Sequence, residues 1–188
     1  MNKSNIFVVL LLIATIVGCN QIKKTEPIKA KEEKTMTKKT VVYQDFTRLF
    51  VNTNTTNKPW GTIEENGVGK FNDFTHEALK GIREFGTTHI WYTGIPHHAV
   101  IRDYTEYGIS NDDPDVVKGR AGSPYAVKDY YNVNPDMAVD PANRLGEFKG
   151  LVDRTHQHGM KFVIDIVPNH VAQYYQSISK PADLRDFG

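Results

Sequence analysis

Three apolar runs separated by two amphipathic segments dominate the pattern of hydrophobic positions along this chain. The runs cover residues 41–50, 88–95 and 161–167, and they are rich in the β-branched and aromatic residues that favour strands. Between them, residues 72–85 and the segment around Phe148 carry apolar side chains at the spacing of one helical face. The pattern therefore predicts the order strand, helix, strand, helix, strand.

The two predicted helices have recognisable ends and one apolar face each. The first is expected to begin at Asn72 or Asp73, whose side chains can cap a helix, and to end at Gly86. The second is expected to end at Gly159. The positions that share the apolar faces are Ala78, Leu79, Ile82 and Phe85 in the first helix and Phe148, Leu151, Val152 and Thr155 in the second.

The predicted strands are apolar on both faces, which indicates a parallel sheet covered by helices. Two α/β architectures contain such a sheet, the (β/α)₈ TIM barrel and the doubly wound sheet. A dinucleotide-binding sheet would carry G-x-G-x-x-G after its first strand, whereas residues 67–70 read only GVGK, which is also too short for a phosphate loop. The sequence therefore favours a partial (β/α)₈ barrel, comprising strands one to three and two crossover helices.

The amino-terminal part of the chain has the composition of an export signal. Lys3 precedes an apolar run over residues 6–17, which is shorter than the ~20 residues of a spanning helix. The run leads to Gly18 and Cys19, which resemble a bacterial lipobox. We therefore expect a lipoprotein signal peptide over residues 1–18 and a lipidated Cys19 that anchors the exported protein on the periplasmic or cell-surface side of a membrane. The alternative is an uncleaved signal anchor with an incidental cysteine.

Residues 19–40 are expected to form a polar tether after the lipidated cysteine. They contain seven Lys and three Glu but almost no large apolar residue, so they cannot bury a core. Attraction of the lysines to anionic headgroups is the alternative to a plain spacer. Over the whole chain, 23 Lys plus Arg nearly balance 22 Asp plus Glu, so we expect no nucleic-acid partner. The folded part is expected over residues 41–188.

Polar side chains follow the third predicted strand at its carboxyl end, the edge at which (β/α)₈ barrels carry their working residues. Residues 165–170 read DIVPNH, and residues 122–136 read GSPYAVKDYYNVNPD. In this order the two motifs resemble the α-amylase family, glycoside hydrolase family 13, whose first signature region is D-x-x-x-N-H. The second predicted strand, preceded by Gly86 and followed by residues 94–96, is similar to the second strand of that family. The resemblance covers essentially all of residues 41–188.

The resemblance implies roles for four residues at this edge. Tyr125 would stack beneath the sugar ring, and His170 would hydrogen-bond the hydroxymethyl side of that sugar. Asn169 looks like the family asparagine whose amide oxygen binds a structural calcium, and Asp165 looks like a buried carboxylate that orients its neighbours. Without the resemblance, His170 is a satisfied structural histidine and Tyr125 a loop or core tyrosine. A purely structural role for Asp165 is open as well.

The function that the resemblance implies is retaining hydrolysis of α-glucans such as starch and maltooligosaccharides. Retaining enzymes need two carboxyl groups ~5 to 5.5 Å apart, which this family takes from strands four and five, with a third carboxylate after strand seven. No catalytic residue is assigned in this chain, because residues 41–188 are fewer than the ~250 of a complete barrel. We therefore expect the chain alone to be inactive. The alternative is a non-catalytic surface lipoprotein that binds glycan through Tyr125 and His170.

Two pairs of histidines are weaker candidates for a metal site. Residues His97 and His98 are adjacent, and His156 and His158 are two positions apart on a predicted helix, so neither pair presents both rings to one zinc ion. We therefore expect these histidines at the surface.

Overall fold

The structure, a computed structural model, describes residues 39–186. The signal peptide over residues 1–18, the lipidated Cys19 and most of the tether are therefore predictions that lie outside the described residues. Within the described part of the chain, every helix is too short or too polar to cross a membrane.

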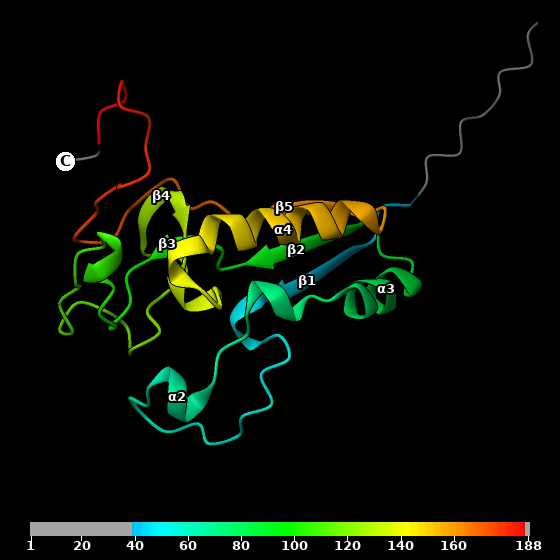
Figure 1. Ribbon diagram of the computed structural model, residues 1–188, viewed down its shortest axis with the longest axis horizontal. Helices are drawn as coiled ribbons and strands as arrows, with labels where there is room; N and C mark the ends of the chain where they lie inside the picture. The colour runs from blue at the N-terminus through cyan, green and yellow to red at the C-terminus, as the bar shows by residue number, and fades with distance from the viewer. Residues whose placement is uncertain (1–38, 187–188) are drawn as a thin grey trace, which may run out of the picture. The chain divides into compact units, whose positions relative to one another are not determined.

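Three parallel strands form the main sheet (Figure 1). They are β1 (Val42–Phe46), β2 (His89–Thr93) and β5 (Lys161–Ile164), and they lie in the order β1-β2-β5. Ile90 of β2 lies opposite Tyr43 on one side and Phe162 on the other. The three strands that the hydrophobic pattern predicts are thus neighbours in chain order, as successive strands of a (β/α)₈ barrel are.

Two helices, α3 (His76–Glu84) and α4 (Arg144–Gln157), cover one face of this sheet (Figure 1). Leu79 and Ile82 of α3 and Leu151 of α4 are buried and share one hydrophobic cluster with Ile90 and Tyr92 of β2. The phenol of Tyr92 also lies 2.7 Å from the hydroxyl of Thr155, so its polar end is satisfied beneath α4. The core is therefore built between the helices and one face of the sheet.

The first helix begins later than the sequence predicts. Residues Phe71–Asp73 form a separate 3₁₀ helix, and the cap of α3 is Thr75, whose side chain accepts a hydrogen bond from the Ala78 backbone N–H. The prediction of a core-facing Phe85 is also wrong, because this side chain is 80% exposed. Phe85 follows the last residue of α3 as its C-cap, where the helical periodicity no longer directs a side chain to the core.

The third strand is less buried than the sequence predicts. Phe162 and Ile164 of β5 are half-buried, and Val163 is 39% exposed. Among the described residues β5 pairs only with β2, so one edge of the strand and the face away from the helices lack a neighbour. Residues 161–167 are therefore more apolar than their partial burial in the described part of the chain would require.

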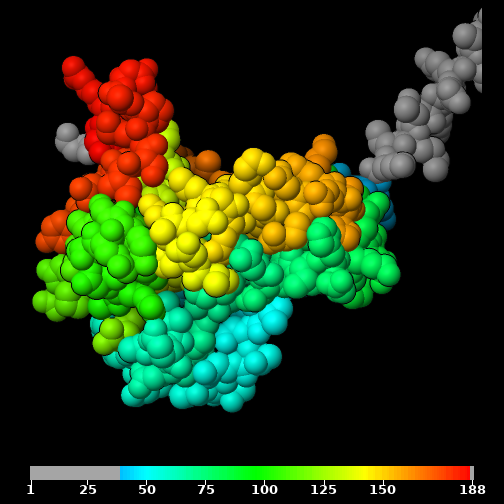
Figure 2. Space-filling model, viewed as in Figure 1, coloured from blue at the N-terminus to red at the C-terminus, as the bar shows by residue number. Residues whose placement is uncertain are grey.

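The long polar segment between the second strand and the second helix contains a two-stranded antiparallel ribbon that the sequence analysis missed. It consists of β3 (Pro96–His98) and β4 (Val127–Val133). The remaining short elements are helix α2 (Ile63–Asn66) and the 3₁₀ helices Thr47–Leu49, Thr105–Tyr107, Pro135–Met137 and Pro141–Asn143. The segment between β1 and α3, which holds α2, forms a projecting lobe coloured cyan in Figure 2.

Candidate functional site

The four residues singled out at the carboxyl end of the third strand lie on two loops. Asp165, Asn169 and His170 follow β5 directly, and Tyr125 precedes β4 by two residues. The carboxyl ends of β1, β2 and β5 point the same way because the strands are parallel. The loops that leave these ends are therefore neighbours at one edge of the sheet.

Asp165 links the ends of two strands. Its carboxylate accepts a hydrogen bond from the Gly94 backbone N–H at 3.4 Å, directly after β2. Residue 94 has a φ of 86°, and a Cβ at this position would lie 3.2 Å from the Phe46 ring. The turn after β2 therefore favours glycine. Asp165 is half-buried rather than buried as the sequence analysis expects. Its contact with the turn after β2 is consistent with a carboxylate that orients its neighbours.

His170 and Asn169 are exposed and in contact with each other. The Nδ1 atom of the His170 ring lies 3.0 Å from the Asn169 amide oxygen. The phenol of Tyr130 on β4 donates to the backbone carbonyls of Val167 and His170, the second at 3.3 Å. Tyr130 of β4 thus holds the backbone of the D-x-x-x-N-H run, while the His170 imidazole is exposed to solvent.

Tyr125 is 45% exposed at the end of a tight turn. The Ala126 N–H donates to the Ser123 carbonyl at 3.0 Å, which closes the turn. Gly122 at its start has a φ of 68° and passes so close to the Ala99 carbonyl that a Cβ would lie 1.8 Å from that oxygen. The turn is therefore fixed against the ribbon, and the Tyr125 ring projects from a defined position.

Backbone hydrogen bonds bring the Tyr125 and His170 loops together. The Ala172 N–H donates to the Val127 carbonyl at 2.8 Å, and each of these residues is two positions from His170 and Tyr125 respectively. The buried carboxylate of Asp129 extends this junction. It accepts from the Ser177 hydroxyl at 2.6 Å and the Ile178 N–H at 3.0 Å. Convergence of the two side chains on one sugar remains a prediction.

A cavity of about 190 Å³ lies at this junction. Ser123 and Ala126 contribute to one side of it, and residues 171–174 contribute to the other. The site residues therefore flank a hollow that both loops line, rather than a flat surface.

The two adjacent histidines of β3 are buried, so the prediction that they lie at the surface is wrong. His98 and His97 are each 2% exposed. The Asn134 amide lies 2.9 Å from the Nε2 atom of His98, whereas neither ring nitrogen of His97 has a hydrogen-bond partner among the described residues. Burial lowers the pKa of His97 to about 3 and also lowers that of His98, so both rings are neutral at physiological pH.

A buried hub centred on Asp136 joins three loops on the same side of the sheet. Its carboxylate accepts two hydrogen bonds from Arg48, at 2.6 and 2.8 Å, and one from the Tyr104 phenol at 2.7 Å. Burial, with the neighbouring Asp136 charge, raises the pKa of Tyr104 well above its usual range. Local sequence patterns do not indicate this hub, because no spacing rule pairs residues that are 88 positions apart.

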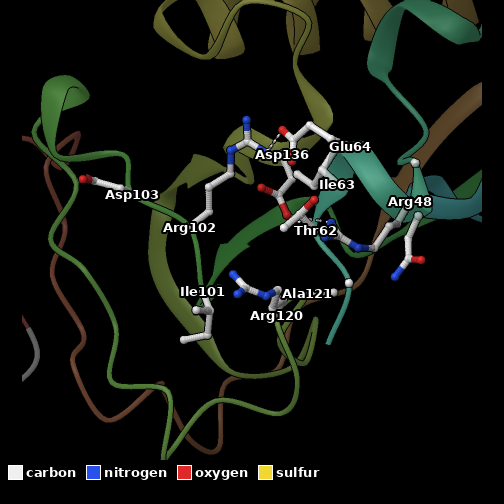
Figure 3. Close-up of a pocket in the computed structure, with 13 residues that line it drawn as sticks. Arg48, Thr62, Ile63, Glu64, Ile101, Arg102, Asp103, Arg120, Ala121 and Asp136 are labelled. Carbon is white, nitrogen blue, oxygen red and sulfur yellow. Dashed lines mark hydrogen bonds and ion pairs between the residues drawn. The ribbon is translucent and has the colours of Figure 1, made fainter. Parts of the chain in front are cut away.

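A second cavity, of about 300 Å³, adjoins this hub (Figure 3). Arg48, Arg102 and Arg120 line it together with Glu64, Asp103 and Asp136, so cationic and anionic side chains are equal in number. Arg102 donates to Glu64 at 2.9 Å. The cavity lies among the loops that follow β1 and β2, on the carboxyl side of the strands.

The calcium expected at Asn169 is not supported by a ligand cage in the described residues. Calcium takes six to eight oxygen ligands, whereas the amide oxygen of Asn169 is in contact with the His170 ring. Across residues 39–186, no group of three or more His, Asp, Glu or Cys side chains is placed to hold a metal ion. The calcium site therefore stays a prediction from the resemblance, and no step of the chemistry is assigned to it.

Comparison with known proteins gives consistent matches. The model of the α-amylase catalytic domain matches residues 44–187. Cyclomaltodextrin glucanotransferase of Geobacillus stearothermophilus is 28% identical over 142 residues, which are 70% of this chain and 18% of that protein. The glycogen operon protein GlgX homolog of Haemophilus influenzae is 26% identical over 153 residues, 73% of this chain and 22% of that protein. This chain thus spans less than a quarter of the length of these relatives.

Among solved structures, an α-amylase from Lactobacillus plantarum is 29% identical, with a TM-score of 0.49. The alignment covers 74% of this chain and 24% of that one. The match to the catalytic-domain model and the chain order of the strands identify the three parallel strands and two crossover helices as part of a (β/α)₈ barrel, as the sequence predicts.

Proposed function

The chain belongs to the α-amylase family of glycoside hydrolases, and we therefore propose that it is the glucan-binding amino-terminal part of an enzyme that cleaves α-glucans with retention. The substrates proposed are starch and maltooligosaccharides. The nucleophile and the acid/base that retention requires are not assigned to any of residues 39–186. The proposal for this chain is therefore substrate binding, with Tyr125 and His170 as the contacts.

The observation that supports this proposal most directly is the hydrogen bond between Val127 and Ala172. It joins the two loops that carry Tyr125 and His170 at the carboxyl side of the parallel strands. An exposed phenol ring can cover the apolar C–H face of a pyranose, and an exposed imidazole can donate to and accept from sugar hydroxyls. Asp165 acts in this proposal as a positioning residue through its bond to Gly94.

We expect Tyr125→Ala and His170→Ala each to weaken maltoheptaose binding by the full chain about tenfold. Tyr125→Ala removes one stacking contact, and His170→Ala removes one hydrogen bond between neutral groups. Isothermal titration calorimetry measures this effect. The matched controls are Tyr131→Ala, which removes a tyrosine that is 42% exposed on β4, and His156→Ala, which removes an exposed histidine near the carboxyl end of α4. Equal weakening by the control variants would contradict the assignment.

A non-catalytic glycan-binding protein is the second candidate, because the described residues carry sugar-contact candidates without an assigned catalytic pair. Release of reducing sugar from starch separates the two functions. The 188-residue chain alone is expected to release none, and a longer in-frame product that binds maltoheptaose equally well but also releases none would favour the second candidate.

Membrane anchoring through Cys19 is a separate part of the proposal. Cys19 is the only cysteine of the chain, so labelling of the expressed precursor with radioactive palmitate reports on that residue alone. We expect Cys19→Ser to abolish the label and to release the protein from the membrane fraction. Unchanged labelling of Cys19→Ser would rule out a lipoprotein.

A further inference from the structure

Trp60 is a large apolar side chain that is displayed to solvent, in the loop between β1 and α2. It is 58% exposed, and its φ is 58°. A left-handed conformation is unfavourable for a residue with a bulky side chain. Such strain persists only where the surroundings enforce it, and it concentrates at functional positions.

Several hydrogen bonds enforce the turn at Trp60. The Gly61 N–H donates to the Lys58 carbonyl at 2.9 Å, and the Asn66 amide both accepts from the Lys58 N–H at 2.8 Å and donates to the Lys58 carbonyl at 3.0 Å. A Cβ on Gly61 would lie 2.5 Å from the Asn66 amide nitrogen, so the turn closes tightly. The Trp60 indole is therefore presented from a rigid position.

The 300 Å³ cavity begins beside this residue. Gly61 lines it directly, and the guanidinium of Arg120, another lining residue, donates through Nε to the Trp60 carbonyl at 2.8 Å. Figure 3 shows Arg102 facing Glu64, while Asp103 lies apart from the other charged side chains. The backbone of an exposed aromatic residue thus adjoins a hollow that offers both donors and acceptors.

The balance of charges in the cavity favours a neutral polyhydroxylated ligand. Three arginines and three carboxylates line the cavity, so an anion gains little net attraction there, and an apolar ligand would leave the charged groups without water. Sugar hydroxyls donate to carboxylates and accept from guanidinium groups, and one face of a pyranose is apolar enough to stack on an indole. The combination fits a glycan.

The cavity is also close to the Tyr125 loop along the chain. Arg120 and Ala121 line it, and Tyr125 follows Arg120 by five residues, which an extended chain spans with at most about 18 Å. Gly122 between them is fixed against Ala99, so this spacing is held. Through the Arg120 bond to its carbonyl, Trp60 is thus connected to the Tyr125 turn by a short stretch of chain.

We propose that Trp60, together with the cavity residues Arg102, Arg120 and Glu64, forms an additional glucan-binding site at which a bound α-glucan extends away from the Tyr125 and His170 position. Trp60 stacks on a sugar ring, and the paired guanidinium and carboxylate groups hydrogen-bond its hydroxyls. This inference rests on the proposed function, because it takes the ligand of the neighbouring site to be an α-glucan.

The test is maltoheptaose binding by the full chain, followed by calorimetry and by tryptophan fluorescence. Trp60→Ala is expected to weaken binding about tenfold, and Trp60→Phe, which keeps an aromatic face, less than threefold. Phe85→Ala is the matched control, because Phe85 is an aromatic that is 80% exposed at the end of α3. Maltoheptaose should protect wild-type fluorescence from acrylamide quenching, and this protection should disappear in Trp60→Phe, which retains only Trp91.

The outcomes separate this inference from the proposed function. Binding that depends on Tyr125 and His170 but is unchanged in Trp60→Ala, with no protection of wild-type fluorescence, overturns the additional site and leaves the proposed function intact. Protection of Trp60 that persists in the Tyr125→Ala variant supports the additional site independently. Absence of any maltoheptaose binding by the folded wild-type chain overturns both.

Discussion

Replacing Asp136 with alanine is expected to lower the free energy of unfolding by about 3 to 5 kcal/mol, because it leaves the Arg48 charge buried without its partner. Asp136 is 2% exposed and the Arg48 side chain 14% exposed, so little water is available to replace the lost contacts. The Tyr104 phenol would lose its acceptor in the same step. Urea unfolding of the full chain at pH 7, followed by circular dichroism, measures the change.

A double variant separates the ion pair from simple loss of packing. Removing both charges in Arg48→Met with Asp136→Leu should recover a large part of the stability lost in Asp136→Ala, since no unpaired charge remains. Asp115→Ala, at an exposed aspartate, serves as the control and should change the free energy of unfolding by less than about 0.5 kcal/mol. If Asp136→Ala unfolds at the same urea concentration as Asp115→Ala, the hub does not stabilise the fold.

Replacing Asp45 with asparagine is expected to stabilise the protein at pH 7, by about 2 to 3 kcal/mol. Asp45 lies on β1 with only 6% of its surface exposed, and its Oδ2 atom has no hydrogen-bond partner among residues 39–186. Burial raises the pKa of this carboxyl to about 6, from 3.8 in an exposed aspartate. At pH 7 the folded protein therefore holds a poorly solvated charge that unfolding would relieve.

The sign of the pH dependence follows from the direction of this shift. Between pH 4 and pH 6 the folded state binds more protons at Asp45 than the unfolded state does, so this residue lowers stability as the pH rises. Below pH 3.8 the carboxyl becomes mainly neutral in both states, and the difference between wild type and Asp45→Asn should become small. The difference in unfolding free energy between wild type and Asp45→Asn is measured at pH 3.5, 5 and 7. Asp115→Asn, at an exposed aspartate, is the control. A constant difference at all three values would exclude titration as the cause.

The order of strands and helices was predictable because each element carries its own periodicity. The buried faces of the two helices are predicted by the spacing of Leu79, Ile82 and Leu151. The apolar run of β2 likewise predicts a strand covered by helices. The start of α3 was not predictable from capping preference alone. Asn72 is a good cap in isolation, but its amide hydrogen-bonds Glu147 of α4, and Thr75 caps the helix instead.

The candidate site was only partly predictable for a related reason. The D-x-x-x-N-H run and Tyr125 were found because their residues are close together in recognisable motifs. The ribbon that joins them was missed, although Val127, the two tyrosines at 130–131 and Val133 form a β-favouring run within β4. The burial of His97 and the Asp136 hub depend on contacts between distant segments, which local patterning does not encode.

Two backbone hydrogen bonds close the base of the loop over residues 102–119. The Ala99 N–H bonds the Ala126 carbonyl at 3.1 Å, and the Ile101 N–H bonds the Arg120 carbonyl at 2.8 Å, so both ends of this loop are secured independently of its length. Extra residues at the exposed turn around Pro114 would cost little closure entropy and would not displace Tyr125. The turn around Pro114 is therefore a position at which related proteins could carry an inserted module without disturbing Tyr125, the proposed sugar contact.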